Sequence, residues 1–370
     1  MSIELINKTP YIASAWDYLN PQGGTFGVSL LRGRFTFRTL DRDTEQWQLT
    51  VAKKQGSLFS ADQYHGKIGQ SSLKYESDYV PYKSGTDIVL NATARTPDKQ
   101  YKAQWDCGIL VQSAEKKTLA RKILCVSGAR QWNNSLLGWK LSEATPCHEV
   151  PLRYENAYGG NAIKTDRKGA FVRYLKFNTN NPVGKGNIHY LDTADTYPAP
   201  QITSLDKPLT SALSESDPEG FGFIARGWQP RLALAGTYDD DWLEKKHPLL
   251  PDDFNVEHYR SASKGLALSH HLQGGEQVTL KHFHAHHTVV RFQLPSYQFF
   301  SSLITTDGGL VVQPLVLDTV LLDIEESNIN QWSVYLSWRG QHILPSTATA
   351  LELFGLDKAE IEPSNTGESP

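Results

Sequence analysis

Short runs in which apolar and polar residues alternate, separated by turns that contain glycine or proline, set the strongest limit on how this 370-residue chain can fold. Alternation with a period of two places every second side chain on the buried face of a strand. Residues 26–38 alternate around Phe35 and Phe37, and the runs 105–112 and 119–126 flank a charged turn, as expected of a hairpin. Hardly any stretch keeps the 3.6-residue period of a helix. The pattern predicts a mainly β protein: an antiparallel, sandwich-like core with few short helices and long loops.

Several further elements follow from the same reasoning. Strands are predicted at residues 2–7, 47–51, 87–94 and 276–294, and a final antiparallel pair at 310–324 and 332–338. Loops are predicted at 53–73 and 188–219, and a helical turn at 349–354. We expect one large mainly β domain over residues 1–356. A division into two packed subunits near 187–217 stays open, and residues 357–370 are expected to form a flexible acidic tail.

Charge and cysteine content exclude some classes of protein. The formal net charge is −3 and no dense stripe of lysine and arginine occurs, which argues against a nucleic-acid-binding protein. Cys107, Cys125 and Cys147 are odd in number and far apart, a pattern that favours reduced thiols over a disulfide framework. No run approaches the ~18 apolar residues that a membrane span needs, and no signal peptide is recognisable. We therefore expect a cytoplasmic protein without membrane insertion.

Residues 217–254 combine glycine and proline with large aromatic rings. Glycine permits positive φ angles, so this mixture predicts a tight irregular backbone packed by aromatic side chains, with Trp228 and Trp242 as anchors. Asp239 to Asp241 offer capping oxygens for a short helix that runs from Trp242 to Lys246. The segment contains no nucleophile, phosphate-binding or metal-ligand pattern. We interpret it as a shaped binding surface.

The same segment carries a resemblance to a known family. The similar residues are Trp228, Arg231, Gly236, Tyr238, Asp239, Trp242, Pro248 and Phe254. Further similar blocks, in consistent order, are residues 78–94, 126–132, 151–160, 181–186 and 317–323. The chain resembles the effector adaptors, or chaperones, of the type VI secretion system. This resemblance extends over most of the chain, which makes it more specific than any single motif.

The resemblance implies a protein without catalytic residues, cofactor or metal. Its expected partner is a secreted toxin, bound through the toxin's N-terminal or spike-tip region. The toxin would be stabilised and loaded onto the spike, and the resemblance leaves open a VgrG or PAAR spike component as a second partner. Candidate contact residues lie beside glycine or proline in the similar blocks and outside regular alternation: Tyr79, Tyr82, Tyr154 and Arg231.

Two alternative functions stay open from the residues alone. One is a carbohydrate-binding β-sandwich that uses tyrosine, tryptophan and aspartate side chains. Glu155 between Tyr154 and Tyr158 suggests a general acid, but a single carboxylate does not make a glycosidase. A glutamate satisfied beneath a turn is the better interpretation. Residues 181–186, NPVGKG, lack the spacing of a phosphate-binding loop and are predicted to shape the backbone only.

The other alternative is a metal-dependent hydrolase centred on residues 282–287. Eight of the twelve histidines lie between His247 and His287. In a strand, His282, His284 and His286 would share one face and could ligate zinc. Same-face neighbours in a straight strand are ~6.6–7 Å apart, however, so three of them cannot reach a single ion. The sequence therefore favours exposed surface histidines and no metal site.

Overall fold

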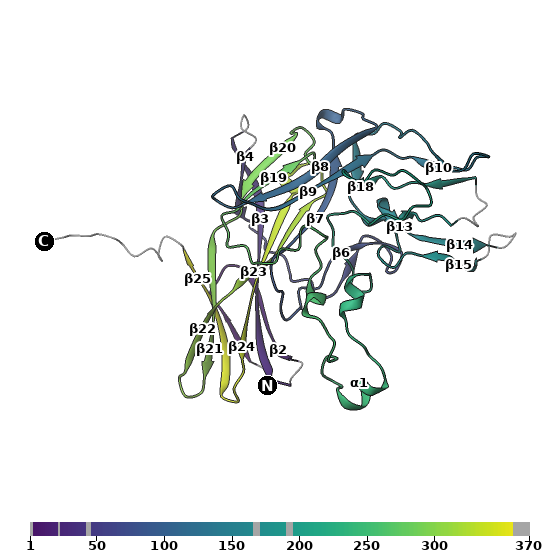
Figure 1. Ribbon diagram of the computed structural model, residues 1–370. Helices are drawn as coiled ribbons and strands as arrows, with labels where there is room; N and C mark the ends of the chain where they lie inside the picture. The colour runs from purple at the N-terminus through teal and green to yellow at the C-terminus, as the bar shows by residue number, and fades with distance from the viewer. Residues whose placement is uncertain (1–2, 21–22, 42–45, 166–170, 190–194, 358–370) are drawn as a thin grey trace.

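The computed structural model describes residues 3–20, 23–41, 46–165, 171–189 and 195–357. Figure 1 shows strands in almost every part of the chain, and within the described residues α1 (Asp240–Lys245) is the only α-helix. The prediction of a mainly β fold is confirmed. The remaining helical turns are of the 3₁₀ type: η1 (Pro97–Lys99), η2 (Tyr154–Asn156), η3 (Arg231–Leu234), η4 (Val256–Tyr259) and η5 (Ile329–Gln331).

A large curled sheet forms the body of the molecule. Its strands, in spatial order, are β12 (Glu149–Pro151), β7 (Asp87–Arg95), β23 (Val316–Ile324), β24 (Ser333–Ile343), β3 (Thr25–Asp41), β4 (Gln46–Val51), β20 (Val289–Gln293), β19 (Gln277–Lys281), β8 (Gln104–Gln112), β9 (Thr118–Ser127) and β18 (Ile202–Ser204). β2 (Ile12–Leu19) pairs with β3 outside this order. β7 and β23 pair in parallel, and most other pairs are antiparallel, so the sheet is mixed.

A four-stranded sheet lies at the lower left of Figure 1. Its order is β1 (Glu4–Asn7), β25 (Ala348–Asp357), β21 (Tyr297–Thr305) and β22 (Leu310–Pro314). β1 pairs with β25 in parallel, so both ends of the described chain meet in one sheet. Leu351 and Leu353 of β25 are fully buried. The predicted helical turn at 349–354 is therefore wrong: Ala, Leu and Glu favour a helix locally, but pairing on both sides with β1 and β21 decides for a strand.

Small sheets extend from the body on the right of Figure 1. One contains β11 (Lys140–Leu141), β10 (Gln131–Asn133) and β17 (Thr196–Pro198); the others are the pairs β13 (Tyr158–Gly159) with β16 (Lys185–Gly186), and β14 (Asn161–Thr165) with β15 (Phe171–Phe177). A separate apolar cluster around Trp132 and Ile188 packs this region. β5 (Gln63–Tyr64) and β6 (Leu73–Tyr75) form a last pair, so the predicted loop at 53–73 is confirmed apart from this short bridge.

Local strand pairs follow the sequence predictions closely. The hairpin β8–β9, the pair β3–β4 and the final pair β23–β24 all form as expected. Two long predicted strands are wrong because each is two strands. The run 276–294 turns back at residues 282–288 between β19 and β20, and the run 310–324 passes at Leu315 from β22 in one sheet to β23 in the other. The 188–219 segment contributes β17 and β18, while residues 358–370 of the predicted tail lie outside the described residues.

Candidate partner-binding surface

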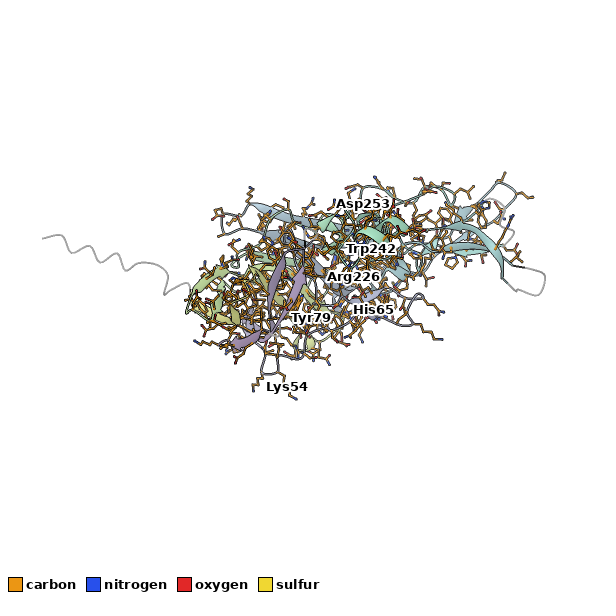
Figure 2. All side chains as sticks on the ribbon, turned by 90° about the horizontal axis from the view of Figure 1, so that it is seen from below. Lys54, His65, Tyr79, Arg226, Trp242 and Asp253 are labelled. Carbon is orange, nitrogen blue, oxygen red and sulfur yellow. The ribbon has the colours of Figure 1, made fainter. Side chains whose placement is uncertain are left out.

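The loop at residues 76–84 carries two of the four predicted contact residues. Tyr79 is 41% exposed and Tyr82 is 40% exposed. The Tyr79 ring lies 5.0 Å from the ring of Trp16 on β2, and its hydroxyl is 3.3 Å from the hydroxyl oxygen of Ser14. Figure 2 shows Tyr79 on the underside of the molecule, where α1 also lies. Partly exposed tyrosine rings are typical of the residues that dominate the free energy of protein–protein binding.

Asp78 fixes the backbone of this loop. Its carboxylate accepts hydrogen bonds from the guanidinium of Arg32 and, at 2.6 Å, from the backbone N–H of Phe59. Its carbonyl oxygen accepts from Arg339 Nη1 at 3.1 Å. Burial raises the pKa of Asp78, and the opposing effect of Arg32 does not cancel that rise. These hydrogen bonds hold the backbone of the loop at Asp78 in one conformation.

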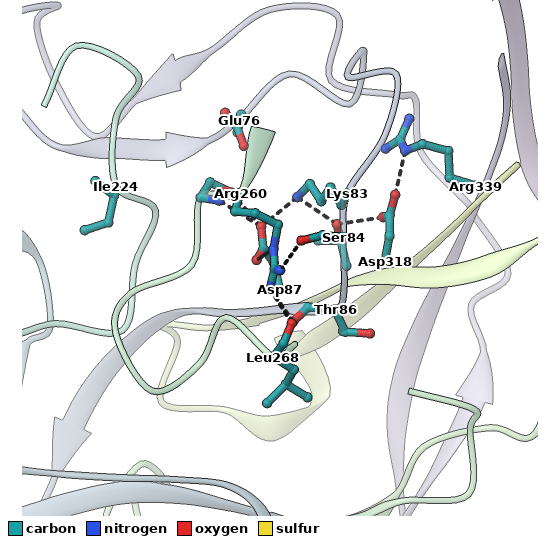
Figure 3. A network of polar contacts seen from close by, with 12 residues as sticks. Glu76, Lys83, Ser84, Thr86, Asp87, Ile224, Arg260, Leu268, Asp318 and Arg339 are labelled. Carbon is teal, nitrogen blue, oxygen red and sulfur yellow. Dashed lines mark hydrogen bonds and ion pairs between the residues drawn. The ribbon is translucent and has the colours of Figure 1, made fainter. Parts of the chain in front are cut away.

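Beneath the loop, Asp87 is fully buried at the start of β7. It accepts hydrogen bonds from Lys83 Nζ at 3.0 Å, from Arg260 Nε at 2.7 Å and from the backbone N–H of Ser261 at 2.8 Å (Figure 3). Burial alone raises the pKa of a carboxyl group, but Lys83 and Arg260 hold the pKa of Asp87 below its ordinary value. A buried carboxylate stays ionised here because two cations face it.

A second buried ion pair continues this network (Figure 3). Arg339 Nε donates to Asp318 Oδ2 at 2.5 Å. Thr319 connects the two pairs, since its hydroxyl accepts from Lys83 Nζ at 3.0 Å and donates to Asp318 Oδ1 at 2.9 Å. The side chains come from β23, β24, β7 and the 76–84 loop, and Arg260 directly follows η4. The network therefore joins the loop to the centre of the large sheet.

Arg231, the third predicted contact residue, is only 3% exposed. It donates from Nη1 to the carbonyl of Ile224 at 2.8 Å, from Nε to that of His258 at 2.7 Å, and from Nη2 to Glu76 Oε1 at 2.5 Å. Burial raises the pKa of Glu76, but the positive charges of Arg231, Lys83 and Arg226 together outweigh it, so that pKa lies below its ordinary value. Arg231 thus links the 76–84 loop, through Glu76, to the backbone at Ile224 and His258. The structure does not support it as a residue that contacts a partner.

Tyr154, the fourth, is 2% exposed and belongs to the main core. Its ring lies 5.5 Å from that of Trp228, edge to face, and its hydroxyl donates to the carbonyl of Gly222 at 3.4 Å. A β-carbon at Gly220 would come within 2.9 Å of the Tyr154 ring, so glycine is required there. Trp228, 8% exposed, anchors residues 217–228 to the core as predicted. A side chain this deeply buried offers no surface to a partner, so Tyr154 is not supported as a contact residue.

Residues 236–254, the α1 segment, project from the body at the lower right of Figure 1. Gly236 has a φ of 82°, and Asp253 closes the base of the segment by accepting from the Thr237 backbone N–H at 2.9 Å. Asp239 caps α1, since its side chain accepts from the Trp242 backbone N–H at 2.9 Å. The predicted cap and helix are confirmed, with the helix at Asp240–Lys245.

Aromatic rings pack the interior of this segment. Trp242 is partly buried, its Nε1 donates to the carbonyl of Leu249 at 2.9 Å, and the ring of Tyr238 lies 4.7 Å away. Tyr238 is nevertheless 53% exposed. Phe254 is partly buried, and its ring lies 5.2 Å from the ring of Tyr259. Figure 2 labels Trp242 and Asp253, which lie near each other in that view.

The histidine run is a turn and not a strand. His282 adopts a φ of 62° directly after β19, and its Nδ1 contacts the carbonyl of Asp106. His282 and His284 are buried, at 9% and 6% exposure, so the prediction of surface histidines is wrong for these two and holds for His286. His284 Nδ1 accepts from the backbone N–H groups of His286 and His287, at 3.0 and 3.1 Å. These histidines shape a turn.

The geometry of the described residues does not support a metal site or a role for Glu155 as a general acid. Within the described ranges no group of three or more His, Cys, Asp or Glu side chains is arranged to hold a metal ion. Glu155 accepts from the Ser72 backbone N–H at 2.8 Å and from the Ser72 hydroxyl at 2.6 Å, so it is a glutamate satisfied beneath a turn, as predicted. Asn181 donates to the carbonyls of Tyr154 and Tyr158, which makes residues 181–186 a backbone-shaping loop. All three cysteines are free thiols.

A small cavity of about 20 Å³ lies between the ion-pair network and the 76–84 loop. Arg32, Glu76, Lys83 and Arg339 line it. This volume suits about one water molecule, whereas drug-sized ligands need clefts of ~300–1,000 Å³. The geometry at this place therefore fits recognition by an exposed surface better than capture of a small molecule.

Comparison with protein families then places the chain. The family described as an uncharacterized protein conserved in bacteria, DUF2169, matches residues 27–339. The chain belongs to this family. The DUF2169 match includes the 76–84 loop, the ion-pair network and the α1 segment, and it leaves out β1, β2 and β25. No curated protein and no solved structure matches the chain. None of the helices in the described part of this DUF2169 protein is long and apolar enough to cross a membrane.

Proposed function

We propose that this protein is an adaptor and chaperone of the type VI secretion system, without catalytic activity of its own. It binds a toxic effector in the cytoplasm through the effector's N-terminal or spike-tip region, stabilises it and promotes its loading onto the spike. The observation that carries the proposal is the pair of exposed rings, Tyr79 and Tyr82, on a loop held rigid by buried ion pairs. The resemblance of several sequence blocks to such adaptors supports it.

Rigid, exposed tyrosines suit this task for a physical reason. Tyrosine offers a large contact area with few rotatable bonds, so little conformational entropy is lost on binding. Trp16 supports the Tyr79 ring from β2, and Arg32 and Arg339 fix the loop backbone through Asp78. A stable complex needs ~800 Å² per partner, so the tyrosines form the centre of a larger contact and not all of it.

Binding of this kind also explains a chaperone role by mass action. A partner that binds only the folded effector adds RT ln(1 + [L]/Kd), or ~2.7 kcal/mol when its concentration is a hundred times Kd. A marginally stable effector without its adaptor unfolds more often and is degraded by proteases. We therefore expect low effector levels in a strain that lacks this protein.

The test uses the toxin encoded beside this gene. In a strain without the gene, toxin level and toxin delivery should both fall, and the wild-type gene should restore them. A Tyr79→Ala/Tyr82→Ala double variant should restore them poorly although the protein still folds, because neither ring belongs to the core. Tyr101→Ala, which truncates a 68% exposed tyrosine outside the loop, is the matched control and should behave as wild type.

Normal toxin level and delivery in the deletion strain, with a spike that still assembles, would refute the adaptor. The Trp16–Tyr79 ring pair would then be tested for carbohydrate binding on a glycan array. Binding of a sugar that is lost in Tyr79→Ala would establish that alternative.

A further inference from the structure

β22 is a free edge strand of the four-stranded sheet. It pairs on one side with β21 and is the last strand in the order, and in the described chain no strand covers its other side. All five residues, LVVQP, are exposed; Leu310 is 63%, Val311 49% and Val312 47% exposed. Natural proteins often protect such edges with charged side chains or proline. This strand contains no charged residue, and its one proline, Pro314, stands at its C-terminal end.

The alternation of hydrogen-bonded positions along β22 shows which of its backbone groups point away from β21. The backbone N–H of Leu315 donates to the carbonyl of Phe299, and that of Thr305 donates to the carbonyl of Gly309. In an antiparallel pair the bonded positions alternate, so the backbone groups of residues 311 and 313 also point toward β21. Those of Leu310, Val312 and Pro314 consequently point outward. Pro314 has no N–H, which fits an outward position, because its lack of a donor breaks no bond within the sheet.

The occupant of this edge must be an extended polypeptide. Outward donors and acceptors repeat at every second residue, and only another strand supplies partners at that spacing. Leu310 and Val312 lie on one face of the sheet and Val311 on the other, so an added strand would cover apolar surface on both faces. Main-chain hydrogen bonds would supply affinity, and the three apolar side chains would favour an incoming strand with apolar residues on both faces.

A second copy of this chain fits the edge less well. In a two-fold antiparallel pairing about Val312, the carbonyl of Leu310 would face Pro314 of the other copy, which has no N–H to donate. Two folded copies would also meet along only five residues, far below the ~800 Å² per partner of a stable interface. A flexible segment of another chain has neither restriction, because it can donate at that position and continue beyond the strand.

We propose that the outward edge of β22 binds an extended, apolar segment of the cargo by strand addition. This inference rests on the proposed adaptor function and adds a second contact, separate from Tyr79 and Tyr82. The added strand would pair with Leu310 and Val312 and extend the sheet by one strand. An edge that is apolar in the free adaptor would thus be covered in the complex.

The test is a proline at the outward position. Val312→Pro removes a donor that points to solvent, as the natural Pro314 does, so the melting temperature should stay close to wild type. Val311→Pro removes an inward donor to β21 and should lower the melting temperature. Val312→Thr keeps the N–H and is the binding control. Each variant is co-expressed with the toxin encoded beside this gene, and toxin retention is measured.

We expect at least tenfold weaker toxin binding by Val312→Pro and near wild-type binding by Val312→Thr. Hydrogen exchange should show rapid exchange of the Leu310 and Val312 amides in the free protein and protection in the complex. Equal toxin binding by wild type and Val312→Pro would overturn strand addition and leave the adaptor function intact. Failure of the wild type to retain toxin would overturn the adaptor function, and with it the cargo as occupant. A dimer that Val312→Pro dissociates would show that a second copy occupies the edge.

Discussion

Replacement of Arg260 by alanine tests whether the buried ion pairs hold the 76–84 loop in place. Arg260 is 8% exposed and makes four hydrogen bonds: to Asp87 at 2.7 Å, to the Ser84 hydroxyl at 2.9 Å, and to the carbonyls of Thr86 and Leu268 at 3.3 and 2.8 Å. The variant leaves a fully buried carboxylate with a single cationic partner, Lys83. Removing one member of a buried pair costs ~3–5 kcal/mol. This is a large share of the ~5–15 kcal/mol that stabilises a typical domain.

Urea denaturation at pH 7 measures this loss, and Lys245→Ala is the matched control. Lys245 pairs with Asp241 at the surface, where both side chains are more than two thirds exposed, so its removal should change the free energy of unfolding little. We expect Arg260→Ala to lower that free energy by about 3 kcal/mol or more. A loss below about 1 kcal/mol, similar to that of the control, would refute the argument that this network is a main anchor of the loop.

The same network predicts how stability depends on pH. Because the pKa of Asp87 is lowered in the folded state, its charge contributes stability above the ordinary value of 3.8, and this contribution is lost as the pH falls through the folded-state pKa. Arg260→Ala removes a cation that lowers this pKa. The pH at which half of the Arg260→Ala variant is unfolded by acid should therefore be higher than that of the wild type.

Two further predictions concern the core and the histidine turn. Trp228→Ala should lower the free energy of unfolding by ~3–5 kcal/mol, because the ring belongs to the main core, whereas Trp242→Ala should mainly open the α1 segment. Urea denaturation measures the global loss of stability in each variant, and limited proteolysis of residues 236–254 measures local opening of the α1 segment. Equal losses of unfolding free energy in both variants would contradict the predicted difference. Burial and the neighbouring His287 and His286 lower the pKa of His284 to about 4 in the folded protein, from an ordinary value of 6.5. The unfolded state therefore takes up a proton first, and stability should decrease as the pH falls from about 6.5 to about 4. His284→Gln should weaken this decrease, measured at pH 7 and pH 5, and an unchanged pH dependence would assign it to other groups.

Sequence reasoning succeeded where the structure is local. The hairpin β8–β9 and the cap of α1 each depend on residues within one short stretch, and alternation or a capping aspartate is enough to find them. It failed where distant pairing decides. The run at 349–354 contains good helix formers, and only its partners β1 and β21 make it a strand.

The candidate surface was predictable only in part for the same reason. Tyr79, Tyr82, Tyr154 and Arg231 all lie within three residues of a proline and outside regular alternation, so nothing local separates the exposed pair from the buried pair. Burial of Arg231 depends on Glu76, which is 155 residues away in the sequence. The ion pair of Asp87 with Arg260 spans 173 residues, and no spacing rule reveals it. The free edge of β22 also required the sheet order, since a run such as LVVQP is compatible with either a central or an edge strand.

The strand order has a consequence for how the protein is made. β7 lies between β12 and β23, and residues 316–324 of β23 are synthesised long after residues 87–95 of β7. At about 5–20 residues per second, β7 leaves the ribosome roughly 10–50 s before its parallel partner exists. Through that interval the nascent chain carries a nine-residue strand, wholly buried in the folded protein, with one side unpaired. Translation of the last quarter of the message, and not the emergence of the N-terminal half, therefore sets when the large sheet can close.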